Sequence, residues 1–374
     1  MNKLSNIYRL GVKELWSLVR DPIMIVLIAF TFTVSIYTAA TAMPDSLNLA
    51  SIAITDEDNS TLSVRIISAF YPPHFVVPEL VSLSDADAGM DSGLYTFSLN
   101  IPPNFQRDVL RGNVPSIQLN VDATRMTQAF TGSGYIQTIL MDEVSEFIER
   151  YRGEDRLPIN MDIRMRFNQN LTPSWFGALT ELINNVTMLS IILTGAALIR
   201  EREHGTIEHL LVMPVTPFEI MSAKVWSMGL VVLLATAFSL TFIVQGALHV
   251  PVNGSPMLFL VGAALHLFAT TAMGIFLATI ARSMPQFGML LVLVLLPLQM
   301  LSGGTTPRES MPEAVQNIML LAPTTHFVEL GQAVLYRGAG IGTIWTSFLA
   351  LFIIGGVLFA LSLQRFRNTI NQMA

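Results

Sequence analysis

Hydrophobic residues gather in six long apolar stretches that are separated by polar segments. The stretches are Ile23–Met43, Trp175–Ile199, Val225–Leu248, Met257–Ile280, Gln286–Gly303 and Ile344–Leu363. A transmembrane helix needs about 20 mostly apolar residues, so this pattern predicts six membrane-spanning helices. The fifth stretch is short and contains Pro297. Proline removes a backbone hydrogen bond, which predicts a kink or break near the end of that helix.

The first 22 residues mix apolar and basic positions at helical spacing. The apolar positions are Leu4, Ile7, Leu10, Leu15, Leu18 and Val19, and the polar ones are Lys3, Asn6, Arg9, Lys13 and Arg20. Such a segment is typical of an amphipathic helix that lies in the inner membrane interface. The alternative is a basic leader without fixed structure.

Residues 44–172 separate the first two stretches and are not a simple linker. Ser51–Thr55, Tyr95–Ile101 and Ser116–Asp122 have the composition of short strands. Leu62–Ala69, Phe105–Arg111 and Thr127–Arg152 have helical patterns. Strands that alternate with helices indicate a small α/β domain, inserted into an otherwise helical membrane protein.

Basic residues in the short connections predict the orientation. Lys3, Arg9, Lys13 and Arg20 precede the first stretch, and Arg200, Arg202 and Lys224 lie between the second and third. Arg282 follows the fourth stretch, and Arg365 and Arg367 follow the sixth. Both termini are therefore expected in the cytoplasm, which places the 44–172 domain outside and the remaining five spans within residues 173–374.

Composition agrees with a membrane protein and excludes several kinds of binding and catalytic site. Hydrophobic residues make up 52% of the chain and charged residues 13%, whereas soluble domains carry roughly a quarter charged residues. The net charge of −6 gives no basic surface for nucleic acid. The sequence contains no cysteine and no G-x-x-x-x-G-K-[S/T] motif, so it has no P-loop for ATP. We expect no catalytic residue, metal site or cofactor in this chain.

A dense charged segment follows the second apolar stretch. Signs alternate at Arg200, Glu201, Arg202 and Glu203, and an apolar run with Leu210 and Leu211 ends at Pro214. Charged groups are costly in lipid, so this segment must lie at the membrane surface. It either forms a short helix that docks on a soluble partner or is a solvated loop whose arginines only set the topology.

Two features near the outer side of the membrane are further candidates for functional elements. Glu181 is ionisable and lies within a span, which makes it a candidate for a transport pathway; its alternative is a carboxylate that water reaches near the span's end. Met311–Leu321 and Thr325–Tyr336 are semi-apolar and too short to span. They predict two short interfacial or re-entrant helices in residues 311–336.

Several motifs together resemble those of a known family. They are Arg20-Asp21-Pro22, Leu99-Asn100-Ile101-Pro102-Pro103-Asn104-Phe105, Gln118-Leu119-Asn120-Val121-Asp122, the run from Arg202 to Pro214, and Pro217-Phe218-Glu219 with Lys224 shortly after. The run from Arg202 is similar to the family pattern E-R-E-x-G-T-x-E-x-L-L-x-x-P. The whole chain resembles the ABC-2 type (type V exporter-like) permeases, in the branch with a large extracytoplasmic domain.

This resemblance implies a mechanism and a set of residues. Two permease subunits, identical or related, would form the pore in a bacterial inner membrane, above a separate or fused pair of ATPase domains that hold ATP and Mg. Residues 201–213 would be the coupling helix on the ATPase, and residues 1–22 the connecting helix. The fifth span and the two outer helices would form the outer gate. The implied coupling residues are Glu201, Arg202, Glu203, Gly205, Thr206, Glu208, Leu210 and Leu211, and the implied gate residues are Pro297, Gly303 and Gly304.

The sequence leaves three functions open. The expected one is the membrane subunit of an ATP-driven exporter for a hydrophobic or amphipathic substrate, with membrane lipid and a periplasmic adaptor as further partners. The alternative is a non-transporting complex that passes ATP-driven motion to an extracytoplasmic partner. A membrane enzyme is the weakest, because the sequence shows no nucleophile–base pair or metal cluster.

Overall fold

The computed structural model describes residues 3–41, 49–122, 126–152, 173–203, 205, 215–306 and 308–373. The chain forms two compact units. One comprises Met1–Met43 with Pro173–Ala374, and the other is Pro44–Thr172. We describe each unit by itself.

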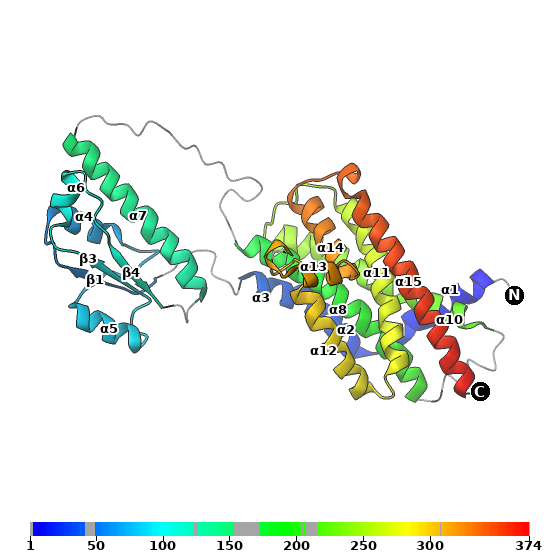
Figure 1. Ribbon diagram of the computed structural model, residues 1–374. Coiled ribbons are helices and arrows are strands. Elements are labelled where there is room, and N and C mark those ends of the chain that lie inside the picture. Colours follow the sequence, from blue (N-terminus) through cyan, green and yellow to red (C-terminus); the bar gives the residue numbers. More distant parts are fainter. Residues whose placement is uncertain are drawn as a thin grey trace. The chain divides into compact units, whose positions relative to one another are not determined.

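The Pro44–Thr172 unit contains a mixed four-stranded sheet (Figure 1). Its elements, in chain order, are β1 (Ile52–Asp56), α4 (Thr61–Ala69), β2 (Glu79–Leu80), α5 (Leu83–Asp91), β3 (Phe97–Ile101), α6 (Phe105–Leu110), β4 (Gln118–Val121) and α7 (Met126–Arg152). The spatial order is β2-β1-β3-β4, with β1 parallel to β2 and β3, and β4 antiparallel to β3. The sequence pattern missed β2 and α5, because β2 has only two residues and α5 carries a weak apolar pattern.

Side chains that alternate along the strands build a core on each face of this sheet. Ile52, Ile54, Phe97 and Leu99 pack with α4 and α7 in the larger core. Ala53, Ala86 and Tyr95 form a smaller core against α5. Helices therefore cover both faces, and the unit has a hydrophobic core of its own.

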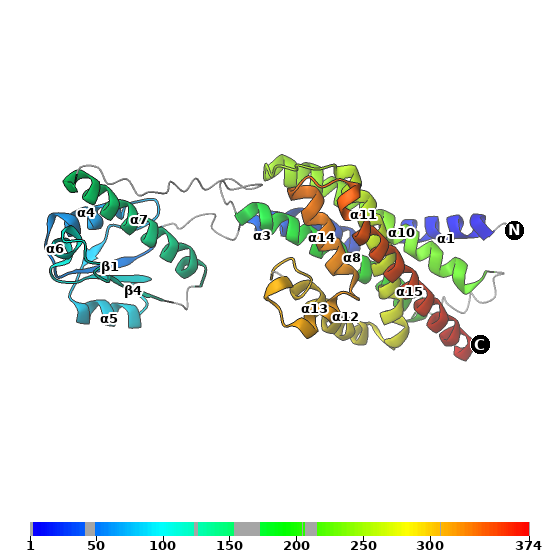
Figure 2. The same cartoon turned by 45° about the horizontal axis from the view of Figure 1, so that its top comes forward.

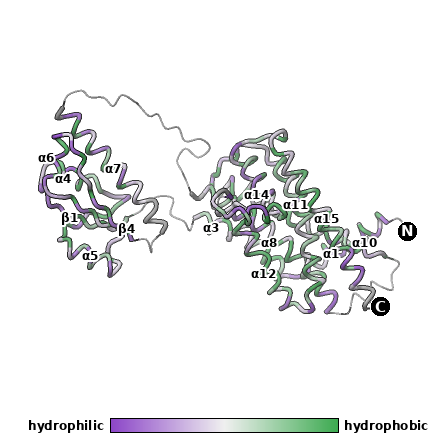
Figure 3. Tube along the Cα trace, viewed as in Figure 1, coloured by the Kyte–Doolittle hydropathy of each residue, from purple (hydrophilic) through white to green (hydrophobic). Residues whose placement is uncertain are grey.

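The second unit is helical. Its elements are α1 (Lys3–Val19), α2 (Pro22–Phe30), η1 (Thr31–Ser35), α3 (Ile36–Thr41), α8 (Pro173–Glu203), α10 (Pro217–Phe238), η2 (Ser239–Ala247), α11 (Pro256–Ile280), α12 (Met284–Met300), η3 (Arg308–Ser310), α13 (Glu313–Met319), α14 (Pro323–Gly331), η4 (Gln332–Tyr336) and α15 (Ile341–Met373). Figure 3 shows hydrophobic residues along most of this unit.

Within the described part of the chain, five helices are long and apolar enough to cross a membrane. They are Pro22–Thr41, Trp175–Glu203, Pro217–Ala247, Pro256–Ile280 and Ile341–Thr369. The predicted fifth span is the shorter apolar helix α12, and the two short outer helices form a pair bent by 91°. The expected fold class, a polytopic helical membrane protein with a small α/β insertion, is confirmed.

The structure changes two local expectations. Helix α12 continues through Pro297 to Met300, so proline does not break it there, and the other expectation, a kink at Pro297, stays a prediction. The third span begins at Pro217 rather than Val225, because Thr216 and Glu219 form a capping box that starts α10. Lys224 therefore lies inside a helix and not in the loop before it.

Helix α11 packs between α8 and α15 (Figure 1, Figure 2). A Cβ at Gly274 would lie 2.6 Å from the carbonyl oxygen of Ile191, so only glycine permits this approach of α11 to α8. The contact brings the backbones of α8 and α11 close together.

Candidate functional site

The last turn of α8 carries four consecutive charged residues, and each of them contacts a different part of the bundle. Arg200 forms an ion pair with Asp21. Asp21 also caps α2, because its carboxylate accepts a hydrogen bond from the backbone N–H of Met24 at 3.2 Å. Arg200 thus holds the junction between α1 and α2.

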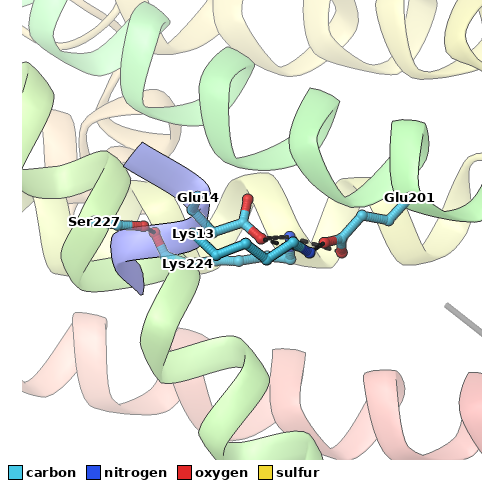
Figure 4. Close-up of polar contacts among 5 residues, drawn as sticks. All are labelled: Lys13, Glu14, Glu201, Lys224 and Ser227. Carbon is cyan, nitrogen blue, oxygen red and sulfur yellow. Dashed lines mark hydrogen bonds and ion pairs between the residues drawn. The ribbon is translucent and has the colours of Figure 1, made fainter. Parts of the chain in front are cut away.

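Glu201 belongs to a buried ionic cluster with Lys13, Glu14 and Lys224 (Figure 4). The Lys224 ammonium lies 3.0 Å from a Glu14 oxygen and 2.7 Å from a Glu201 oxygen. Lys13 reaches the other Glu201 oxygen at 3.0 Å. The cluster joins α1, α8 and α10 at one point.

Burial of this cluster costs free energy unless each charge is paired with an opposite one. The Lys224 side chain is only 1% exposed, and an isolated buried ammonium would be strongly unfavourable. Two carboxylates compensate it. Burial also raises the pKa of the Glu14 carboxyl, and the nearby Lys224 offsets part of that rise. Removal of either sign of charge would leave the other uncompensated.

Arg202 and Glu203 bind the two ends of the connection between α11 and α12. The Arg202 guanidinium donates to the carbonyl oxygens of Ala278, at 3.3 Å, and of Ala281. The Glu203 carboxylate accepts from the backbone N–H of Met284 at 2.9 Å. A cation at a helix C-terminus and an anion at an N-terminus both suit the helix dipoles.

Helix α1 is attached to α10 by polar contacts as well as by apolar ones. Asn6 and Glu14 are buried, whereas Leu4, Tyr8, Trp16 and Val19 are exposed. The Asn6 amide donates to Glu219 at 3.1 Å, and the Trp226 indole N–H donates to the carbonyl oxygen of Ile7 at 3.2 Å. Leu18 is buried in the core of the bundle and Leu10 packs against it, whereas the exposed Leu4, Tyr8, Trp16 and Val19 suit a lipid surface.

The predicted coupling residues divide into two groups. Glu201, Arg202 and Glu203 form the end of α8 and not the start of a separate helix, and Gly205 follows with a φ of +68°. Thr206, Glu208, Leu210 and Leu211 lie outside the described residues. Sequence reasoning missed Glu14, Asp21 and Lys224 as partners; a lone lysine directly before an apolar stretch was the available signal.

The predicted gate residues lie at the other end of the bundle. Gly303 and Gly304 line a cavity of about 410 Å³ together with Arg308, Thr325 and Glu329. Gly303 has a φ of +95°, which glycine adopts without strain. Pro297 lies in α12 before this cavity and does not line it.

Glu181 is half-buried near the same end. Its carboxylate accepts a hydrogen bond from the Ser35 hydroxyl at 2.9 Å and so links α8 to η1. Its role in a transport pathway stays a prediction.

Together with these sites, a bundle of apolar helices whose charges are concentrated at the helix ends defines a polytopic membrane protein. Residues 22–363 match the family model described as ABC-2 family transporter protein. The chain belongs to this family and is a permease subunit of an ABC-2 transporter.

Comparison with curated proteins agrees with this family assignment. The chain is 62% identical over 374 residues, 100% of both chains, to the inner membrane transport permease YhhJ of Escherichia coli (strain K12). It is 25% identical over 366 residues, 96% of this chain and 97% of the relative, to the probable multidrug ABC transporter permease YbhR of the same organism. The chain is therefore a multi-pass inner-membrane permease, and its family implies an ATPase partner.

Proposed function

We propose that this permease moves a hydrophobic or amphipathic molecule out of the cytoplasm with ATP that a separate or fused ATPase subunit hydrolyses. ATP and Mg would bind to that partner and not to this chain. Two permease subunits, identical or related, would enclose the pore. The name of the relative YbhR, a probable multidrug permease, supports this substrate class.

The main support is the arrangement of charges at the end of α8. This turn contacts three other parts of the bundle. Arg200 binds the α1–α2 junction, Glu201 pairs with Lys224 of α10, and Arg202 and Glu203 bind the α11–α12 connection. The segment 204–214 continues directly from this turn. Force applied there by an ATPase would reach five helices at once, which is what a coupling element requires.

The proposed orientation places this end in the cytoplasm. The termini and the cluster would then face the ATPase, and the Pro44–Thr172 unit would lie outside. Arg65 supports the integrity of that unit, since it pairs with Glu143 and Glu146 and so ties α4 to α7. An independent folded unit also favours the second candidate, transmission of motion to an extracytoplasmic partner such as an adaptor.

The attachment of α1 to α10 provides a test of coupling. A Cβ at Gly11 would lie 2.1 Å from the Trp226 ring, so Gly11→Val should push α1 away from α10. We expect the reconstituted complex with its ATPase to keep hydrolysing ATP while export of a fluorescent amphiphile falls at least tenfold.

Gly356→Val is the matched control, because a Cβ at this helical glycine meets no atom within 4 Å. It should leave both hydrolysis and export near wild type. Full export by a stable Gly11→Val protein would contradict transmission through α1. Hydrolysis without any outward movement of an amphiphile in the wild type would favour the second candidate function.

A further inference from the structure

The cavity at the Phe176 end of α8 has the size and the mixed lining of a ligand site. Its volume of about 410 Å³ falls within the range of small-molecule pockets. Phe176 and Val328 give it an apolar side. Phe176 is held in place by stacking on Tyr336, with ring centroids 5.0 Å apart.

Positive charge predominates on the polar side of this cavity. Arg308, Arg337 and Glu329 line it. Within the described residues, neither arginine forms an ion pair, and the buried Arg308 Nε has no hydrogen-bond partner. Glu329 instead accepts a hydrogen bond from Ser347 at 3.4 Å. A buried guanidinium donor without an acceptor is costly, and an anion would satisfy it.

Further donors point to the same ligand chemistry. Thr325 also lines the cavity, is only 3% exposed, and its hydroxyl has no partner among the described residues. Thr325 lies in the first turn of α14, where the helix dipole favours negative charge. Arginine donors, a hydroxyl and a helix N-terminus together suit a phosphate or carboxylate.

We propose that this cavity binds the anionic headgroup of an amphipathic substrate, with the headgroup at Arg308 and Arg337 and the alkyl part along Phe176 and Val328. The assignment rests on the proposed export of an amphipathic molecule and narrows it to acidic amphiphiles. Glu329 limits the affinity, because it places one negative charge in the same cavity.

Direct binding tests this without ATP or an ATPase. The probe is radiolabelled dodecyl phosphate, measured at equilibrium on the full chain in nanodiscs of zwitterionic lipid. Dodecanol, which has the same chain without the charge, and inorganic phosphate serve as competitors. We expect saturable binding, with dodecanol and inorganic phosphate each at least tenfold weaker as competitors than unlabelled dodecyl phosphate.

Charge variants then locate the site. Arg308→Gln with Arg337→Gln should weaken dodecyl phosphate binding at least tenfold, whereas Arg282→Gln, an exposed arginine on the α11–α12 connection, should not change it. Glu329→Gln should strengthen binding, an effect that misfolding cannot imitate. Equal competition by dodecanol or by inorganic phosphate, unchanged binding in the double variant, or weaker binding in Glu329→Gln would each overturn the assignment.

The two proposals fail separately. Intact headgroup binding in a complex that exports nothing would refute the export function alone. Export that proceeds normally in the double arginine variant would refute this assignment and leave the export function standing.

Discussion

At its Glu203 end, α8 places each charge of its last turn against a partner within the chain, whereas near its Phe176 end two arginines line a cavity and form no ion pair with any residue that the structure describes. The two sites lie about 35–40 Å apart along one helix, at 1.5 Å per residue. Paired charges define a fixed geometry, and unpaired charges retain the capacity to bind. The same helix thus connects the paired charges at its Glu203 end to a candidate binding site at its Phe176 end.

The largest expected effect on stability comes from Lys224, at the centre of the buried ionic cluster. Lys224→Met would leave Glu14 and Glu201 buried without their shared cation, so we expect a loss of roughly 3–5 kcal/mol in the free energy of unfolding. Thermal unfolding of the purified chain measures this. Lys13→Met is the control, because Lys13 is 53% exposed and should contribute about 1 kcal/mol or less. Similar losses in both variants would mean that the cluster has no buried centre.

A smaller effect is expected at the α11–α12 connection. Arg202→Gln removes the cation that binds the carbonyl oxygens of Ala278 and Ala281, which should cost roughly 1.5–3 kcal/mol. Hydrogen exchange should also quicken at the end of α11. The exposed Arg282→Gln, on the same connection, serves as the reference, and equal exchange in both variants would rule out this role for Arg202.

The partly exposed pair at the α1–α2 junction should matter less. Arg200 and Asp21 keep 29% and 22% of their side chains exposed, so Arg200→Gln should cost about 1 kcal/mol or less. That loss should shrink as salt is added, because screening weakens the wild-type pair. Unfolding measured at low and high ionic strength checks this, and a loss that salt does not change would place the pair out of reach of solvent.

The smallest effect should come from the cavity. Arg308→Gln and Arg337→Gln remove charges that have no ion pair among the described residues, so the free energy of unfolding should fall by no more than about 0.5 kcal/mol. Thermal unfolding in ligand-free nanodiscs is the measurement. A loss above roughly 2 kcal/mol would show that these arginines stabilise the fold, and the contrast between the two ends of α8 would not hold.

The sequence predicted the spans and drew attention to the charged turn of α8, but it did not predict the partners of these charges. Apolar stretches of about 20 residues predicted the spans, and alternating charges predicted a special role for Arg200–Glu203. The partners could not be predicted, because Glu14 and Lys224 lie 210 residues apart and meet only through tertiary packing. Helix α1 shows the same limit, since the polar Asn6 and Glu14 are buried while the apolar Leu4 and Val19 are exposed.

The separation of Glu14 and Lys224 along the chain also has a consequence for how the protein is made. A ribosome adds about 5–20 residues per second, so the 210 residues between them take roughly 10–40 s to synthesise. During that interval α1 has no α10 on which to dock. Its outward-facing Leu4, Tyr8, Trp16 and Val19 would hold it on the membrane surface until Lys224 arrives.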